Sequence, residues 1–429
     1  MALRRGFVRY AFSIQYHGSS FLGFAHLKDQ EDAVLPDGTD LRGYRSMEGR
    51  LRDAFTQMVG KERFQNIKVS SRTDRGVHAL KNTCHVDIRN RDNTTNDDED
   101  DDDEMLQATE EKDTPSTKIC SSSSSTWDPD VLRRGLNYHL SQQGSELMPT
   151  NNTQDTMTKR EQRKLARRAK RKADSWSFHY PMNELRILNM IRAPLQMKNK
   201  FHYFAMDKTG NPTIPEYVDW NVRFSANQRT YIYRILALAK SEQADWALPF
   251  EWDRSWRIVR PPPKSQLDKN STLSSKRKDS SSEQFVLDID AMQEAAPHFI
   301  GTLDYSSFRS AGCQRASPIV TIQNVQVVSQ PYGEPLFWEA SGGLLGFGDT
   351  NNHNTPQEPQ LVTVKVVGKS FVYRQVRNMV GALVAVGRGS IPPDAIPELL
   401  EAKDRTLAPP MAPAHGLFLV NVQHDDIQL

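Results

Sequence analysis

The sequence predicts a protein of the α+β or α/β class with a largely antiparallel sheet, and three observations support this. Apolar and polar residues alternate in segments such as 10–16 and 82–89, which is the period of a half-buried strand. Apolar residues recur every three or four positions in segment 46–59, which is the period of a helix with one buried face. Segments of the two kinds interleave in both halves of the chain, which indicates mixed layers.

The strand period and the helix period together predict most elements along the chain. The expected strands cover 10–16, 66–70, 82–89, 184–191, 320–328 and 360–367. The expected helices cover 46–59, 131–140, 288–300, 371–387 and 393–402. Asp128-Pro129-Asp130 is typical of a helix start, where the missing donor of Pro costs little. Segment 219–238 is interpreted as two strand halves on either side of 227–229.

Length and composition narrow the class of protein. A chain of 429 residues can form two domains with cores of their own, and a hydrophobic content of 37% points to polar segments outside those cores. No run approaches the eighteen or so apolar residues of a membrane span. The three cysteines are too few and too scattered for a disulfide framework or a zinc site, so we expect reduced thiols in an intracellular protein.

The net charge of +2 conceals a strong segregation of charge. Residues 97–104 are eight consecutive acids, and residues 159–172 carry nine Lys or Arg against one acid. We interpret 92–126 as a disordered insertion, 143–174 as a second insertion containing the basic run, and 262–283 and 333–357 as further insertions. The basic run fits a nuclear localisation signal, an RNA-contacting arm or a solvated helix equally well. The acidic run fits a spacer, or a segment that pairs with the basic run.

One short segment contains several residues that could take part in catalysis. Ser70-Ser71-Arg72-Thr73-Asp74-Arg75-Gly76-Val77-His78-Ala79-Leu80 lies between two expected strands and holds an Arg, an Asp and a Gly in a turn. Such a turn can present Asp74 as a nucleophile or general base, with a neighbouring guanidinium favouring its charged form. Gly76 permits a positive φ or a close approach. Taken alone, such a segment is more often a surface turn with a local ion pair.

This segment resembles the catalytic loop of the TruA-type tRNA pseudouridine synthases, whose usual form is Gly/Ser-Arg-Thr-Asp-Ala-Gly-Val-His-Ala. Four further segments resemble that family in its order along the chain: 224–233, 301–309, 371–381 and 412–419. Segments 371–377 and 412–419 are most similar to the eukaryotic tRNA pseudouridine synthase-like branch. The five segments span about residues 10–422, interrupted by the insertions.

The resemblance implies an α+β fold of two ferredoxin-like subdomains that share a mostly antiparallel sheet, with helices on one side and a central catalytic cleft. We place the subdomains at 1–248 and 249–429. The implied catalytic residues are Asp74, Arg377 and Tyr231, with Arg72 as a further cation beside the carboxylate. The implied substrate contacts are Thr73, Gly76, His78, Arg229, Tyr233, Arg309, Leu417 and Leu419.

Several of these residues have ordinary alternatives. Tyr231 and Tyr233 share one face of a strand, so both fit core packing; the resemblance assigns base stacking to Tyr231. Arg374 and Arg377, three positions apart on the expected helix, also fit a solvated basic stripe. Arg309, His78 and the apolar Leu417 and Leu419 fit structural roles as well.

The sequence departs from the family pattern at three places. Arg75 stands where the family has Ala beside the catalytic Asp, which adds a cation there. Thr230 replaces an Arg of bacterial members, and Leu303 stands where His is common. The Thr230 replacement weakens the transfer of substrate positions from bacterial members.

The resemblance implies an isomerase that converts a uridine of tRNA to pseudouridine, without a metal or cofactor because the reaction has no redox change and no group donor. The expected partner is tRNA, no membrane is expected, and a homodimer is one arrangement implied by bacterial members. The alternatives are a catalytically silent RNA-binding or RNA-folding protein on the same fold, and an RNA–protein scaffold that depends on the basic insertion. The target uridine and the choice between cytosol, nucleus and mitochondrion stay open.

Overall fold

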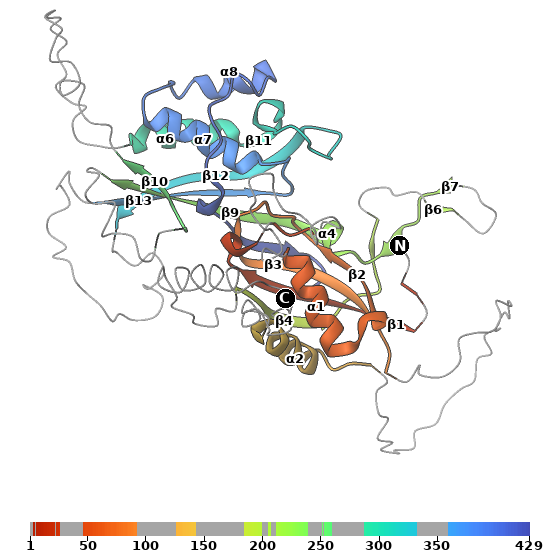
Figure 1. The fold of residues 1–429 in the computed structure, drawn as a ribbon. Helices are drawn as coiled ribbons and strands as arrows, with labels where there is room; N and C mark the ends of the chain where they lie inside the picture. Colours follow the sequence, from red (N-terminus) through yellow and green to blue (C-terminus); the bar gives the residue numbers. More distant parts are fainter. Residues whose placement is uncertain are drawn as a thin grey trace, which may run out of the picture.

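The computed structural model describes residues 3–4, 6–21, 23–25, 46–91, 126–142, 184–199, 205–206, 212–238, 251, 253–259, 287–332 and 359–429. Within these ranges the protein is an α+β structure built on one large, mostly antiparallel sheet (Figure 1). The insertions expected at 92–126, 143–174, 262–283 and 333–357 lie outside the described residues, apart from Thr126.

The large sheet has ten strands in the described ranges. Eight follow the order β11-β12-β13-β9-β14-β3-β1-β4, while β10 pairs with β9 and β2 with β3. The bounds are β1 (Phe7–Tyr16), β2 (Phe64–Val69), β3 (His78–Arg89), β4 (Leu185–Arg192), β9 (Ala226–Leu238), β10 (Trp256–Val259), β11 (Gly301–Asp304), β12 (Ile319–Pro331), β13 (Gln360–Gly368) and β14 (Leu417–His424). Among these pairings, only β10 with β9 and β14 with β3 are parallel.

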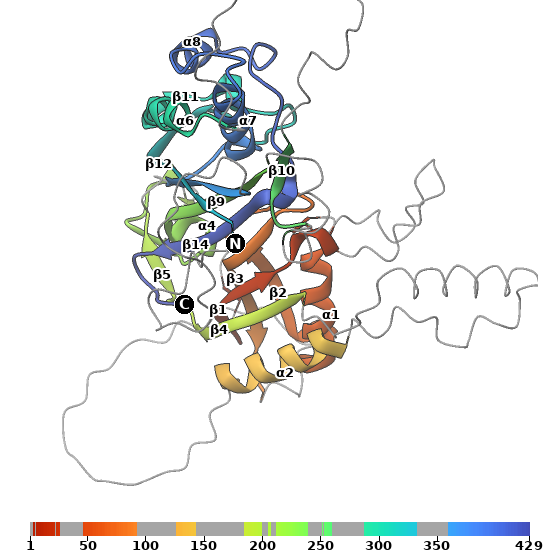
Figure 2. The same ribbon diagram turned by 90° about the vertical axis from the view of Figure 1, so that its left-hand side faces the viewer.

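Two groups of helices accompany the sheet. Helices α1 (Met47–Val59) and α2 (Pro129–Gln142) lie beside β1 to β4, and α2 packs against β4. Helices α6 (Ile289–Ala295), α7 (Gln375–Gly387) and α8 (Ala395–Ala402) gather near β11 to β13, at the other end of the molecule in Figures 1 and 2. The short helix α4 (Val222–Ser225) precedes β9, and two small two-stranded sheets pair β5 (Gln196–Lys198) with β8 (Tyr217–Asp219) and β6 (Ala205–Met206) with β7 (Pro212–Thr213).

Local sequence explains where several helices begin. The Ser46 hydroxyl accepts a hydrogen bond from the Gly49 amide at 3.1 Å, and the Asp128 carboxylate accepts one from the Val131 amide at 2.9 Å. The Asp288 carboxylate does the same for the Ala291 amide at 2.9 Å. Each cap satisfies an amide that has no partner within its helix, which fixes the first turn.

Strands β9 and β14 join the two halves of the sheet. Strand β14, the last of the chain, lies between β9 and β3 and pairs antiparallel with β9 and parallel with β3. The expectation of two strand halves within 219–238 was wrong. Strand β9 runs unbroken through 227–229, because β14 pairs with it at Gln228 and Arg229 and β13 joins at Arg229.

Helix α7 also differs from expectation. It begins at Gln375 rather than Phe371, because Arg374 takes a left-handed conformation with φ 60° and ψ 16°. From there on the helix is buried on nearly all sides; Ala385 alone among its residues is not buried. A helix that is apolar all round belongs inside a protein, which is why α7 can carry a functional side chain into the interior.

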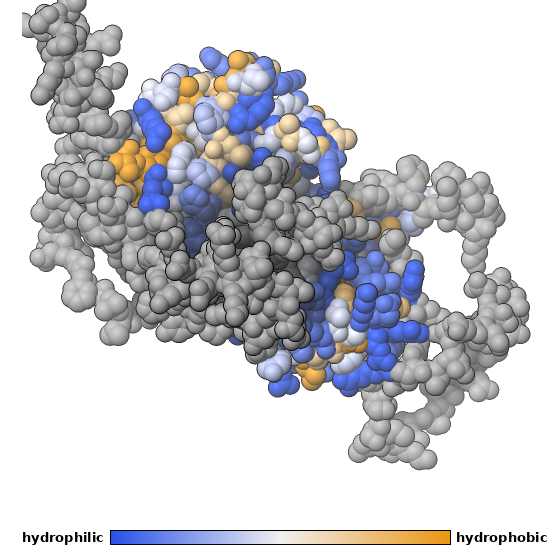
Figure 3. Space-filling model, in the orientation of Figure 1, coloured by the Kyte–Doolittle hydropathy of each residue, from blue (hydrophilic) through white to orange (hydrophobic). Residues whose placement is uncertain are grey.

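None of the helices in the described ranges is long and apolar enough to cross a membrane. On the face of the molecule seen in Figure 3, hydrophilic residues predominate and apolar ones are interspersed among them.

Candidate active site

The loop from Ser70 to Val77 connects β2 to β3 and carries Asp74. Its backbone is held at several points: the Thr73 carbonyl accepts from the Phe24 amide at 3.3 Å, and the Asp74 carbonyl accepts from the Val77 amide at 3.1 Å. The Thr73 hydroxyl and the Tyr16 hydroxyl lie 2.7 Å apart in a hydrogen bond. Gly76 has a φ of 80°, which an L side chain rarely adopts. The loop therefore presents Asp74 in one fixed place.

Two arginines from the start of α7 flank the Asp74 carboxylate. Arg377 Nη1 lies 3.4 Å from Asp74 Oδ2, and Arg374 Nε lies 3.7 Å from the same oxygen. The Asp74 side chain is 20% exposed and that of Arg377 is 10% exposed. The expected contact between Arg377 and Asp74 is thus present, and Arg374 adds a second cation.

Arg377 is fixed by more than its ion pair. Its Nε donates to the Ala412 carbonyl at 2.8 Å, and its own carbonyl accepts from the Ala412 amide at 3.1 Å. Burial lowers the pKa of Arg377 from its usual value, while the neighbouring Asp74 opposes that shift. The guanidinium therefore bridges segment 410–412 and the carboxylate as one rigid unit.

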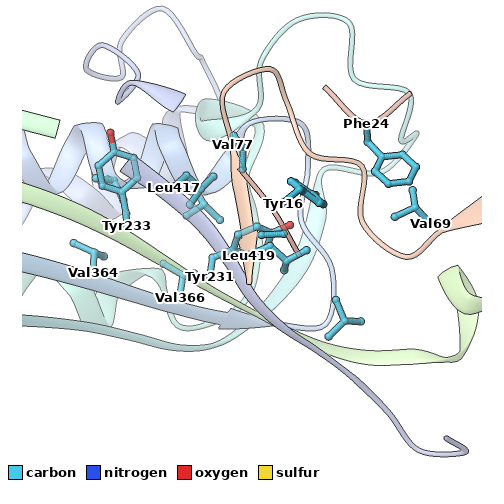
Figure 4. Packing of buried hydrophobic residues seen from close by; sticks show 14 of the residues in the cluster. Tyr16, Phe24, Val69, Val77, Tyr231, Tyr233, Val364, Val366, Leu417 and Leu419 are labelled. Carbon is cyan, nitrogen blue, oxygen red and sulfur yellow. The ribbon is translucent and has the colours of Figure 1, made fainter. Parts of the chain in front are cut away.

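Tyr231 projects from β9 opposite Val366 of β13 and Leu419 of β14. Its hydroxyl and the Ser71 hydroxyl lie 2.7 Å apart, and its ring meets the Phe371 ring edge to face at 5.1 Å. Burial raises the pKa of Tyr231, so the phenol is neutral at physiological pH. Figure 4 shows Tyr231 close to Leu419, with Leu417 nearby.

A pocket of about 920 Å³ opens beside these groups, and its charged lining is strongly unbalanced. Among the residues that the structure describes, two carboxylates line it, Asp74 and Glu48. Eight cationic residues from the same described ranges line it: Lys68, Arg72, Arg223, Arg229, Arg315, Lys369, Arg374 and Arg377. A concave surface with such an excess of one sign attracts polyanions and raises their local concentration.

Aromatic and apolar side chains line another part of the pocket. Phe24, Phe371, Tyr373, Tyr231 and Leu417 all line the pocket. A flat apolar wall of this kind suits a planar ring, and the surrounding cations suit a charged backbone.

Three of the predicted substrate contacts line the pocket, as does Arg72, and these four side chains differ in how tightly they are held. Thr73 and Leu417 are buried in its wall. Arg229 is buried too, and its Nη2 donates to the Ser70 carbonyl at 3.1 Å and the Ser70 hydroxyl at 3.0 Å, which anchors the start of the Asp74 loop. Arg72 is exposed, and among the described residues Asp74 forms ion pairs with Arg374 and Arg377 but not with Arg72.

The other predicted contact residues lie outside the pocket lining. The Tyr233 hydroxyl donates to the Pro413 carbonyl at 2.7 Å, and Leu419 is fully buried. Arg309 donates to the Cys313 carbonyl at 3.1 Å and so shapes its own loop. Gly76 provides the turn beside Asp74 rather than pocket wall.

His78 is a buried ring packed between His17 and Phe418, with centroid distances of 4.6 Å to each. Its Nδ1 accepts from the Gly18 amide at 3.1 Å, which leaves Nε2 to donate to the Asp253 carbonyl at 2.9 Å and the His415 carbonyl at 3.1 Å. Burial, together with the neighbouring His17, lowers the pKa of His78 to about 4. The ring is thus neutral at physiological pH and ties the base of the Asp74 loop to two other segments.

Sequence reasoning missed several pocket residues. It assigned no role to Phe24, Lys68, Arg223, Arg315, Lys369, Phe371, Tyr373 or Arg374. The spacing of Arg374 and Arg377 had placed both on one side of a helix, and both do reach Asp74. Arg374 does so from the left-handed residue before the helix, a geometry that the helical pattern does not predict. In the described part of the chain, no group of three or more His, Cys, Asp or Glu is arranged to hold a metal ion.

Fold and pocket together define a class: an α+β protein in which a carboxylate between two arginines faces an aromatic-walled, cationic pocket. The family model described as tRNA pseudouridine synthase matches residues 295–425, which include α7 and β14. The chain is 26% identical over 421 residues to human (Homo sapiens) tRNA pseudouridine synthase-like 1, covering 98% of this chain and 91% of that protein.

Bacterial relatives show the same likeness. Identity is 24% over 418 residues to tRNA pseudouridine synthase A of Ruegeria sp. (strain TM1040), covering 97% of this chain and 96% of that protein. It is 34% over 211 residues to the protein of that name from Xanthobacter autotrophicus, covering 49% of this chain and 61% of the relative. Over most of its length the chain is thus similar to tRNA pseudouridine synthases of the TruA type.

Proposed function

We propose that this protein is a tRNA pseudouridine synthase, an isomerase that converts a specific uridine of tRNA to pseudouridine with Asp74 as the essential carboxylate. The observation that carries the proposal is the contact of Asp74 with Arg377 and Arg374 at the wall of a cationic pocket. The family relationship supplies the reaction class.

The reaction requires a carboxylate in its ionised form. The N1–C1′ glycosidic bond of uridine breaks, the uracil turns, and a new bond joins C5 to C1′; C5 then loses a proton and N1 gains one. Asp74 either attacks C1′ or removes the C2′ proton, and the geometry is compatible with both routes. Either role needs a carboxylate held toward the sugar, and the two arginines beside Asp74 serve catalysis by keeping it in place.

Tyr231 is proposed to stack on the displaced uracil and to assist in moving the C5 proton. Leu417 forms the apolar wall behind the base, and Thr73 and Arg229 hold the loop that carries Asp74. Arg72, exposed at the pocket rim, is proposed to contact RNA as a further cation beside the carboxylate. Gly76, His78, Tyr233, Arg309 and Leu419 contribute by shaping the site around these groups.

The target uridine must leave its stack to reach Asp74, so the substrate is a shaped RNA from which one nucleotide is extruded. The cationic residues that line the pocket support backbone contacts with such an RNA. Binding should therefore weaken steeply with salt, because neutralised phosphates release counterions.

At the level of the fold, we propose two ferredoxin-like subdomains, 1–248 and 249–429, with helices on one side of the shared sheet and the catalytic cleft between them. Strand β14 would then be the element by which the C-terminal subdomain completes the N-terminal one. A homodimer is the corresponding proposal for the assembly, and size measurement in solution tests it.

The test is pseudouridine mapping on the tRNA pool of the host after incubation with purified protein. We expect sites that appear with the wild type and fall at least 1,000-fold in rate with Asp74→Asn, since removing the central catalytic group of an enzyme costs at least this much. Asp130→Asn, on the exposed face of α2, is the matched control and should retain full activity.

An Asp74→Asn protein with wild-type activity would contradict the role of Asp74. If neither protein modifies any tRNA but both bind it, the alternative of an RNA-binding protein on this fold replaces the proposal. Deletion of 150–175 separates the third alternative, the scaffold, because only a scaffold built on the basic insertion would lose all RNA binding.

A further inference from the structure

Of the two arginines that form ion pairs with Asp74, Arg374 is the one whose side chain donates no hydrogen bond within the described structure. Its Nε lies 3.7 Å from Asp74 Oδ2, which is beyond hydrogen-bond distance, and the side chain donates no hydrogen bond to any described residue. Nε itself is buried, while the side chain as a whole is 37% exposed. Arg377, by contrast, donates to Ala412 and Asp74. Buried donors rarely lack a partner, so this one indicates a ligand.

The backbone around Arg374 is held so that the side chain reaches the pocket. Arg374 is left-handed, a conformation that is unfavourable for a residue other than Gly and that tends to persist at functional sites. The turn is fixed from both sides: the Gln375 side chain accepts from the Val372 amide at 2.9 Å, and Cys313 Sγ accepts from the Tyr373 amide at 3.4 Å. Because of these bonds, helix α7 begins at Gln375 and does not extend back to residue 374, whose side chain is directed toward Asp74.

The guanidinium is also oriented. Its central carbon lies 4.6 Å from the centroid of the Tyr373 ring, in a cation–π contact that holds the group over the ring. A planar guanidinium with free donors matches the oxygens of a phosphate in a two-pronged arrangement. Lys369 and Arg315 line the same pocket, so the surroundings of Arg374 favour an anion.

We propose that Arg374 binds the phosphodiester group next to the target uridine and so holds the nucleotide with its C1′ toward Asp74; this rests on the proposed function. In this proposal Arg377 and Arg374 have different roles. Arg377 is fixed and orients the carboxylate, while Arg374 is a substrate-binding residue that positions the reacting sugar.

The first test needs no turnover. The affinity for total host tRNA is measured over a range of salt concentrations for wild type, Arg374→Gln and the matched control Arg388→Gln, an exposed residue at the far end of α7. Loss of one phosphate contact should reduce the slope of log affinity against log salt by about one, and weaken binding roughly tenfold at low salt. The control should leave the slope unchanged. Arg374→Gly, which suits the left-handed backbone, should repeat the result without a folding defect.

The second test identifies the phosphate. In a substrate RNA, the phosphate on either side of the modified uridine is replaced by an uncharged methylphosphonate. At one of the two positions, the replacement should raise the KM of the wild type about tenfold. The KM of Arg374→Gln should not rise further with the same replacement. Equal losses in both proteins at both positions overturn the proposal, as does an unchanged salt slope. Absence of pseudouridine formation by the wild type would instead contradict the proposed function, and the salt slope would still decide whether Arg374 binds phosphate.

Discussion

At the residue scale, the site depends on what a guanidinium can do that an ammonium cannot. Arg377 contacts two acceptors at once, the Ala412 carbonyl through Nε and the Asp74 carboxylate through Nη1. The flat, forked group reaches both without bending, and it stays charged although burial lowers its pKa. A lysine at the same position has one charged nitrogen and could not contact both acceptors with this geometry.

Arg377→Lys should therefore lower kcat by roughly 100-fold, since a catalytic group displaced by about 1 Å costs that much. The affinity for tRNA should change less than about threefold, because one cation of a large set remains. Single-turnover kinetics and tRNA binding measured on the same preparation separate the two effects. Arg388→Lys serves as the control, and a kcat within fivefold of wild type for Arg377→Lys would contradict the orienting role.

Also at this scale, the sequence indicated Asp74 because a short loop with Arg, Asp and Gly between two strands is a local pattern. It assigned Tyr231 and Arg377 through the family resemblance. It gave no role to Arg374, since the left-handed turn that directs this residue depends on contacts with Cys313 and Gln375 rather than on the residue itself.

At the scale of the element, α7 positions the site only because it lies close to segment 410–412. Gly381 makes this approach possible. A Cβ at that position would lie 2.1 Å from the Pro410 carbonyl oxygen, which is far inside contact distance. The absence of a side chain thus brings α7 near enough for Arg377 and Ala412 to exchange two hydrogen bonds.

Gly381→Ala should separate the two segments. We expect a loss of about 1–3 kcal/mol in the free energy of unfolding, as for other overpacked cores, with a fall in kcat because Arg377 moves with the helix. Urea unfolding and turnover measure the two. Ala385→Ser, which also adds one atom to α7 but at a less buried position, should be near neutral. Unchanged stability and activity in Gly381→Ala would show that the segments are not closely coupled.

The hydrophobic periodicity of the sequence predicted most helices and strands. The two errors at this scale have a common cause. Strand β9 was expected to break at 227–229, and α7 was expected to start at Phe371. In both cases a tertiary partner overrode the local pattern: β13 and β14 extend β9, and the turn around Arg374 delays α7.

At the scale of the whole molecule, buried neutral histidines connect distant segments. His78 joins the Asp74 loop to Asp253 and His415, and His85 accepts from the Val222 amide at 3.2 Å through Nδ1. Burial lowers the pKa of His78 to about 4 and that of His85 to about 3. Protonation of either ring at Nδ1 would break the hydrogen bond that this nitrogen accepts.

These shifts predict a fold that weakens in mild acid. The unfolded chain takes up protons on its histidines as pH falls through about 6.5, whereas the folded chain does so only near pH 4, so stability declines between these values. Within this window, each such histidine contributes about 1.4 kcal/mol per pH unit to the slope of the unfolding free energy. His78→Gln should reduce that slope by about this amount, even if it lowers stability at every pH.

Urea unfolding at intervals between pH 7 and pH 5 measures the slope. His298→Gln, the same substitution at an exposed position, is the control. An identical slope for His78→Gln and wild type would mean that His78 is not kept neutral by burial.

By itself, the sequence determined the fold class, the bounds of most elements, the candidate carboxylate and the resemblance to a family, because these depend on short-range periods and on motifs that are contiguous in the chain. Only the tertiary structure decided which charges surround Asp74. Residues 74 and 231 and the pair 374 and 377 come from three separate stretches of the chain, and they meet because β14 lies between β9 and β3 and because Gly381 lets α7 approach segment 410–412. Long-range strand order and close backbone contact leave no local signature, since they are set by the packing of elements against one another.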